Sequence, residues 1–229
     1  MIIDFHAHIH PGADHGCRDV DTARSQLELA RENGVGAVVT VSHYYPMRDN
    51  IDDYLRRRER GREELGRLTE QDGALPRVFF GTEVTLCHGL EKMPRLDSLT
   101  VEGTNLLLVE MPYDRWDASL LDTLESIRAE RGIVPLLAHM DRYNPGETEA
   151  LLRDGYMGQL NIEALTGIFG RRRLTGWAER GYISALGSDI HGVSVGYRHL
   201  KRAKSALGSE LFDAIMARSA RLLDIEEQK

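Results

Sequence analysis

The sequence predicts an α/β barrel of parallel strands, and three observations carry this prediction. Seven short apolar runs recur along the chain, at residues 2–5, 37–41, 77–81, 105–109, 133–138, 158–162 and 183–186. Most lack strict polar alternation, which is typical of parallel strands covered on both faces. Charged, helix-compatible segments separate the runs, and metal-binding residue types follow most of them. This last feature favours a barrel over an open doubly wound sheet, the alternative for such a βα pattern.

The segments between the runs have the marks of helices. Residues 21–33 place leucines on one side and end at Gly34, a good residue for a helix C-terminus. Residues 117–131 carry leucine and isoleucine at helical spacing and stop before Gly132. Residues 55–71 form a run of mixed charge, which we interpret as a solvated helical face with i,i+4 ion pairs.

Composition limits the classes of function. The chain has 229 residues, 41% hydrophobic and 28% charged, which predicts one globular domain over residues 1–229. A net charge of −7 disfavours a nucleic-acid partner. Cys17 and Cys87 are too few for a disulfide framework, and no apolar run is long enough to span a membrane. We therefore expect a cytoplasmic protein that does not insert into membranes.

Histidines and acids follow the predicted strands at the same point of each repeat. One His-x-His pair ends the first strand, and period-two geometry points both imidazoles to one side. The nine candidate metal ligands are His6, His8, His15, His43, Glu83, Glu110, His139, Asp189 and His191. Any one of them alone is more often a surface residue, but the carboxyl ends of parallel barrel strands meet at one mouth. The repetition therefore predicts a metal cluster there.

Nine ligands are too many for one ion and suggest two or three divalent cations. Mixed imidazole and carboxylate donors suit Mn, with Fe or Zn as alternatives. Ions roughly 3.5–4 Å apart lower the pKa of a bridging water to about 7, so we expect a metal-bridging hydroxide as nucleophile. We place Arg142, Asp189 and His191 nearest to the reaction. Arg142 either holds a phosphate or forms an ordinary salt bridge, and Arg198 is a weaker candidate of the same kind.

Six stretches together resemble the polymerase and histidinol phosphatase (PHP) superfamily. They are residues 4–9 (DFHAHI), 41–43 (VSH), 81–84 (GTEV), 108–110 (LVE), 138–143 (AHMDRY) and 187–191 (GSDIH). The arginine–tyrosine pair at 142–143 resembles in particular the CpsB/CapC branch, manganese-dependent bacterial protein tyrosine phosphatases of capsule and exopolysaccharide operons. The resemblance covers nearly the whole chain.

The resemblance implies a distorted (β/α)7 TIM-like barrel with three metal ions. One would be held by His6, His8, Glu83 and Asp189, the second by Glu83, Glu110 and His139, and the third by His15, His43 and His191. It further implies a phosphotyrosine protein as substrate and a membrane-associated tyrosine kinase as partner. The branch usually has aspartate where this chain has His15, so Asp14 is an alternative ligand. Its Arg-Pro-Pro segment is replaced by residues 195–198, which leaves open whether Arg198 contacts phosphate.

Three other functions compete with a protein tyrosine phosphatase. The first is a PHP-type phosphatase of a small metabolite such as histidinol phosphate. The second is an amidohydrolase- or TatD-like metal hydrolase, which also begins with His-x-His, although His43 and His191 argue against it. The third is a barrel without catalysis that regulates a kinase by binding it.

Overall fold

The strands of the protein pair only in parallel wherever the structure describes them. The structure is a computed structural model that describes residues 1–167, 170–193 and 196–225. Its strands are β1 (Ile2–Ala7), β2 (Val35–Thr40), β3 (His43–Tyr44), β4 (Arg77–Phe80), β5 (Glu83–Thr85), β6 (Leu106–Glu110), β7 (Val134–Leu137), β8 (Met157–Asn161) and β9 (Ile183–Gly187). The seven predicted strands are therefore confirmed, with boundaries that shift by at most two residues.

Two short strands depart from the prediction. The hydrogen-bonded order is β1-β2-β4 in one sheet and β3-β5-β6-β7-β8-β9 in a second, so the chain crosses between sheets after β2, after β3 and after β4. His43 and Glu83 do not simply follow β2 and β4, as the sequence suggested, but begin β3 and β5 and pair with each other. This break makes the barrel distorted, because its ladder is interrupted at these crossings.

The first and last strands are joined by backbone contacts beyond β9. The amide of Asp189 donates to the carbonyl of His6 at 2.8 Å, and the amide of His8 donates to that of Ile190 at 3.1 Å. Gly187 allows this approach, since a Cβ there would lie 2.5 Å from the His6 Cβ. The buried carboxylate of Asp4 adds to the join by accepting hydrogen bonds from the Ser188 amide (2.9 Å) and the Tyr197 hydroxyl (2.6 Å).

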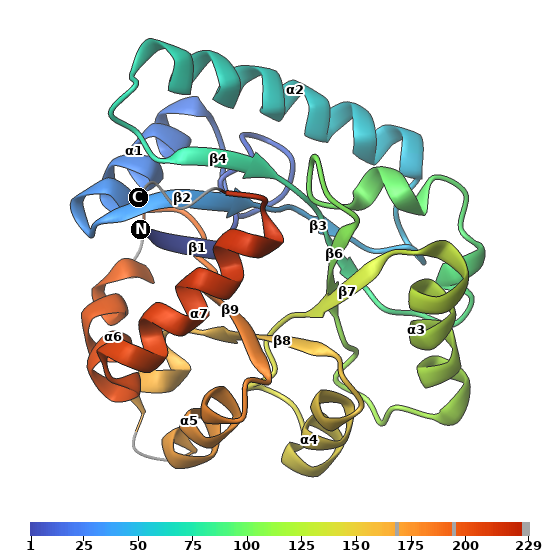
Figure 1. Ribbon diagram of the computed structural model, residues 1–229. Coiled ribbons are helices and arrows are strands. Elements are labelled where there is room, and N and C mark those ends of the chain that lie inside the picture. Colours follow the sequence, from blue (N-terminus) through green and yellow to red (C-terminus); the bar gives the residue numbers. More distant parts are fainter. Residues whose placement is uncertain (168–169, 194–195, 226–229) are drawn as a thin grey trace.

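Helices cover the outside of the strands (Figure 1). They are α1 (Val20–Glu32), α2 (Ile51–Gln71), α3 (Ala118–Arg131), α4 (Pro145–Arg153), α5 (Arg171–Glu179), α6 (Leu200–Leu207) and α7 (Ser209–Leu222), with short 3-10 turns at Leu90–Lys92, Leu96–Leu99, Ala164–Thr166 and Gly196–His199. The predicted helices at 21–33 and 117–131 are α1 and α3, each capped by an aspartate that accepts a backbone N–H of the first turn. Across the described ranges, no helix combines the length and apolar character needed to cross a bilayer.

Helix α2 contains the predicted charge run, but its ion pairs differ from the expected i,i+4 pattern. Arg62 approaches Glu59 at 3.3 Å, an i,i+3 pair. The side chain of Arg58 instead donates a hydrogen bond outside α2, to the Ser98 carbonyl at 2.8 Å. The helix also buries one apolar stripe, including Leu65, against the strands. The partners of these arginine side chains therefore depend on the tertiary structure, which the local sequence does not specify.

Candidate metal centre

Four imidazoles from the ends of three strands converge on one carboxylate. His6 and His8 end β1 with their Nε2 atoms 3.1 Å apart, which confirms that both rings point to one side. The Glu83 Oε2 atom lies 3.3 Å from each of these nitrogens and 3.0 Å from His43 Nδ1. Its Oε1 atom lies 2.9 Å from His139 Nε2. Glu83 is therefore at the centre of the cluster, with its side chain completely buried.

The donor atoms fit divalent cations. Within the described residues, three-membered groups with ligand atoms at most 4.8 Å apart are His8–His43–His191, His6–His8–Asp189, His6–Glu83–His139 and His43–Glu83–Glu110. Glu83 Oε2 and His43 Nδ1 are buried and make no hydrogen bond there, although they lie 3.0 Å apart. Buried polar atoms normally have partners. A cation among these atoms satisfies them all.

Two members of the cluster have unusual backbone conformations. His139 has φ of 56° and Asp189 has φ of 53°, in the left-handed region that non-glycine residues rarely adopt. Each comes just after a barrel strand, so the chain turns sharply there and directs the side chain inward. Such conformations cost about 1–3 kcal/mol each and cluster at functional sites, where surrounding contacts hold them.

Outer hydrogen bonds fix the tautomers of three imidazoles. The Nδ1 atoms of His6 and His139 lie 3.3 Å from Gln159 Oε1 and 3.0 Å from Asn161 Oδ1. Because these amide oxygens only accept, Nδ1 carries the proton and Nε2 keeps its lone pair for the cluster. Asp14 does the same for His8 at 2.9 Å. Gln159 and Asn161 were not among the predicted site residues, although two amides at alternate positions of an apolar run were a usable signal.

The structure distinguishes Asp14 from His15. Both carboxylate oxygens of Asp14 are engaged, one by His8 Nδ1 and the His43 amide (both 2.9 Å), the other by the Gly16 amide (2.8 Å). The ring of His15 stacks on His43 with centroids 5.1 Å apart and lies 4.8 Å from the ring of His191. His15 therefore lies beside the candidate ligands, whereas Asp14 orients one of them.

The cluster strongly favours positive charge. Burial opposes the imidazolium of His8, yet the hydrogen bond to Asp14 and the nearby negative charge of Glu83 outweigh it and raise the His8 pKa to about 10. Burial likewise opposes the carboxylate of Asp189, but nearby imidazoles, His6 foremost, hold its pKa below the ordinary value. The same carboxylates that retain protons on imidazole attract metal cations.

Arg142 lies at the open side of the cluster. Its Nη2 atom is 2.5 Å from Asp189 Oδ2, and its side chain is 34% exposed. Of the two alternatives for Arg142, a salt bridge is present, and its partner is Asp189 rather than the adjacent Asp141. Arg198 is exposed and donates to His199 at 3.0 Å, and no described contact joins it to the cluster. Residue 195 of the segment singled out earlier lies outside the described residues.

Glu110, at the end of β6, completes the predicted set. Its carboxylate accepts a hydrogen bond from Thr85 at 3.2 Å and belongs to the group with His43 and Glu83. All nine predicted ligands are thus brought to one mouth, eight of them within the groups of close donor atoms and His15 stacked beside them. Cys17 is buried, its thiol pKa raised to about 12 by desolvation, so no thiolate nucleophile is available there.

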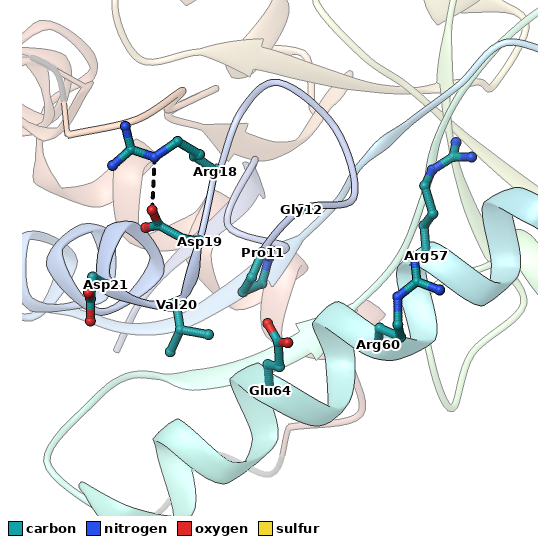
Figure 2. Close-up of a pocket in the computed structure, with 9 residues that line it drawn as sticks. All are labelled: Pro11, Gly12, Arg18, Asp19, Val20, Asp21, Arg57, Arg60 and Glu64. Atoms are coloured by element: carbon teal, nitrogen blue, oxygen red, sulfur yellow. Dashed lines mark hydrogen bonds and ion pairs between the residues drawn. The ribbon is translucent and has the colours of Figure 1, made fainter.

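A pocket is present between the residues that Figure 2 labels. It measures about 550 Å³ and is lined by Pro11, Gly12, Arg18, Asp19, Val20, Asp21, Arg57, Arg60 and Glu64. Its charges are mixed, and Arg18 is already paired with Asp19 at 2.8 Å. None of the nine candidate ligands is among its lining residues, so its size does not mark it as the reactive site.

Comparisons with known proteins agree with the fold. One similar solved structure comes from work on YwqE of Bacillus subtilis and CpsB of Streptococcus pneumoniae, which are described as unique metal-dependent tyrosine phosphatases. It is 22% identical to this chain, and the match has a TM-score of 0.80 and covers 98% of this chain and 95% of that one. The phosphotriesterase homology protein of Escherichia coli, with phosphate in its active site, is 10% identical with a TM-score of 0.60, over 96% of this chain and 97% of that one. A β-aspartyl dipeptidase of Fervidobacterium islandicum is 13% identical with a TM-score of 0.55, over 96% of this chain and 72% of that one.

The comparison with curated protein sequences gives no significant match. The family model described as "Capsular polysaccharide synthesis, CpsB/CapC" matches residues 2–220. This span contains all nine candidate ligands, the arginine at 142 and every described strand. The chain therefore belongs to the CpsB/CapC family of capsular polysaccharide synthesis.

Proposed function

We propose that this protein is a metal-dependent phosphomonoester hydrolase that acts on phosphotyrosine in proteins. The observation that carries the proposal is that three imidazole nitrogens lie 3.0–3.3 Å from one carboxylate oxygen of Glu83, and that this oxygen makes no hydrogen bond. Family membership and the likeness to metal-dependent tyrosine phosphatases support the choice of reaction. The neighbouring dipeptidase has the same kind of fold, but the amidohydrolase alternative has no support from the family match.

The proposed ligands are the nine residues of the cluster. His6, His8, Glu83 and Asp189 would hold one ion, Glu83, Glu110 and His139 a second, and His15, His43 and His191 a third. Divalent cations, manganese being our first choice, would offset phosphate charge and lower the pKa of a water molecule when bound.

The chain's own residues would bind and orient the substrate. Arg142 has a planar fork of donors that matches phosphate, and it lies at the exposed edge of the cluster beside Asp189. Phosphate binding would exchange the Asp189 contact for one to phosphate oxygens. Gln159, Asn161 and Asp14 keep the imidazoles in the tautomers that face the cluster. A phenolate leaves readily, so a weak proton donor suffices for phosphotyrosine.

Several finer statements belong to the same proposal. We propose one domain over residues 1–229, a cytoplasmic location, and a membrane-associated tyrosine kinase as the phosphorylated partner. The family's role in capsular polysaccharide synthesis supports a partner of this kind.

The test is hydrolysis of a phosphotyrosine peptide by protein that has been stripped with chelator and titrated with Mn²⁺, Zn²⁺ and Mg²⁺. We expect turnover to return with metal. His6→Ala and Asp189→Ala should lose activity by more than the roughly 10–100-fold typical of outer contacts. Elemental analysis should show reduced bound metal in both variants.

His88→Ala is the matched control, because this histidine is 59% exposed and paired with Asp117 outside the cluster. It should keep full metal content and activity. Turnover of histidinol phosphate but not of the peptide would replace the proposed substrate with a small metabolite. Loss of neither metal nor activity in His6→Ala would refute the proposed centre.

A further inference from the structure

Exposed apolar side chains gather on loops around the metal cluster. Apart from Met1, the large apolar or aromatic side chains exposed within the described residues are Met47 (81%), Tyr113 (73%) and Val193 (62%). Each lies on a loop that follows a candidate ligand, four residues after His43, three after Glu110 and two after His191, respectively. Single exposed apolar residues are ordinary, but three on the loops of one mouth are typical of a binding surface.

Tyr113, the one aromatic residue of the three, is supported by two buried rings. The Tyr113 ring lies 5.9 Å from that of Tyr143, which lies 5.4 Å from that of Trp116. The Trp116 indole donates to the Pro112 carbonyl at 2.9 Å and so fastens the loop to itself. Trp116 and Tyr143 are buried, so two core rings hold an exposed one in place. An aromatic ring kept in water by its own fold is suited to contact a ligand.

Two of these side chains, Tyr113 and Val193, adjoin residues at the open side of the cluster. The side chains at its centre are fully buried, namely His6, His8 and Glu83. Exposure rises outward to 30% at His191 and 34% at Arg142. Val193 follows His191 closely in sequence, and Tyr113 rests on the residue next to Arg142. Tyr113, by contact, and Val193, by sequence, are therefore next to the residues at the exposed edge of the cluster.

We infer that Met47, Tyr113 and Val193, hereafter the apolar rim, dock the side chains that flank phosphotyrosine in an extended protein segment. The inference rests on the proposed function and names the surface that selects its substrate. Arg142 supplies the positive charge that the phosphate requires, whereas the apolar rim has no charge and suits the apolar side chains next to the phosphotyrosine. A small polar metabolite would leave the rim in water, whereas a peptide covers it.

The experiment compares the wild-type protein with the triple variant Met47→Ser/Tyr113→Ser/Val193→Ser. Two Mn²⁺-dependent reactions are followed, hydrolysis of a phosphotyrosine peptide with apolar flanking residues and hydrolysis of free phosphotyrosine. We expect kcat/KM for the peptide to fall on the order of tenfold through KM, as loss of partial apolar burial implies. The value for free phosphotyrosine should change less than about twofold, because that substrate has no flanking residues to dock. The conservative variant Met47→Leu/Tyr113→Phe/Val193→Ile should behave as wild type.

Binding of a fluorescent, non-hydrolysable phosphonate peptide, measured by anisotropy, separates docking from catalysis. Weaker binding to the serine variant supports the rim even if the wild type hydrolyses neither substrate, a result that would refute only the proposed reaction. Equal peptide binding by wild type and serine variant would overturn the rim. An equal loss of activity on peptide and free phosphotyrosine would also overturn it, since the residues would then serve the phosphate site.

Discussion

Substitution of Asn161 by alanine tests how the outer amides control the metal centre. The Asn161 side chain accepts from His139 Nδ1 at 3.0 Å and donates to Asp189 Oδ2 at 3.2 Å. It thus contacts two proposed ligands that belong to different ions. Alanine would leave the His139 N–H without its acceptor and free the imidazole to adopt the other tautomer. The Asp189 carboxylate would lose one of the contacts that direct it toward the cluster.

The expected effect is a 10–100-fold loss of Mn²⁺ affinity, which corresponds to about 1.4–2.7 kcal/mol. This range is comparable to the cost of leaving one buried polar group unsatisfied, roughly 1–3 kcal/mol. Competition with a fluorescent chelator measures the affinity directly and does not depend on turnover. Thermal unfolding of the chelator-treated protein should show that the variant still folds.

Asn105→Ala is the matched control, because that amide donates to the Gly132 carbonyl at 2.9 Å, just before β6 begins and therefore at the opposite end of this strand from Glu110. It should leave Mn²⁺ affinity unchanged. Affinity within twofold of wild type for Asn161→Ala would refute the argument that this amide orients the ligands. An equal loss in Asn105→Ala would show that general destabilisation, not tautomer control, is measured.

Three further predictions concern the contacts that join the first and last strands, the first helix and the third ion. Tyr197→Phe removes a 2.6 Å hydrogen bond to the buried Asp4 carboxylate and should lower the free energy of unfolding by about 1.5–3 kcal/mol, measured in urea; an unchanged midpoint would contradict this. Hydrogen bonds from Thr22 and Arg18 lower the Asp19 pKa from 3.8 to about 2. The stabilising effect of this carboxylate is therefore present above pH 3.8 and is lost as the pH falls through 2. In Asp19→Asn the free energy of unfolding should depend less on pH over that range. His15→Ala should reduce bound metal by one ion, whereas Asp14→Ala should weaken affinity but reach full stoichiometry at saturating metal, by elemental analysis.

Local sequence patterns were sufficient for most of the elements. The apolar runs predicted seven strands, and glycines at 34 and 132 marked helix ends correctly, because both signals act within a few residues. The strands at β3 and β5 were missed, since a strand of two or three residues has no periodicity and forms only where a neighbour offers a partner. The i,i+4 pairs expected on α2 were wrong for a related reason, because Arg58 found a partner forty residues away in the chain.

The sequence by itself determined the fold class, the family and the residues that meet at the mouth of the barrel. The fold class and these residues follow from periodicity and from ligand types placed at equivalent points of successive repeats, and the family follows from the resemblance of six short stretches. Only the tertiary structure decided which atoms face one another: that Asp14 supports His8, that Gln159 and Asn161 fix two imidazoles, and that Arg142 meets Asp189. Periodicity specifies the side of a strand on which a residue lies. The partner of each polar atom depends on distances between strands that are far apart in the chain, and these are set only when the barrel packs.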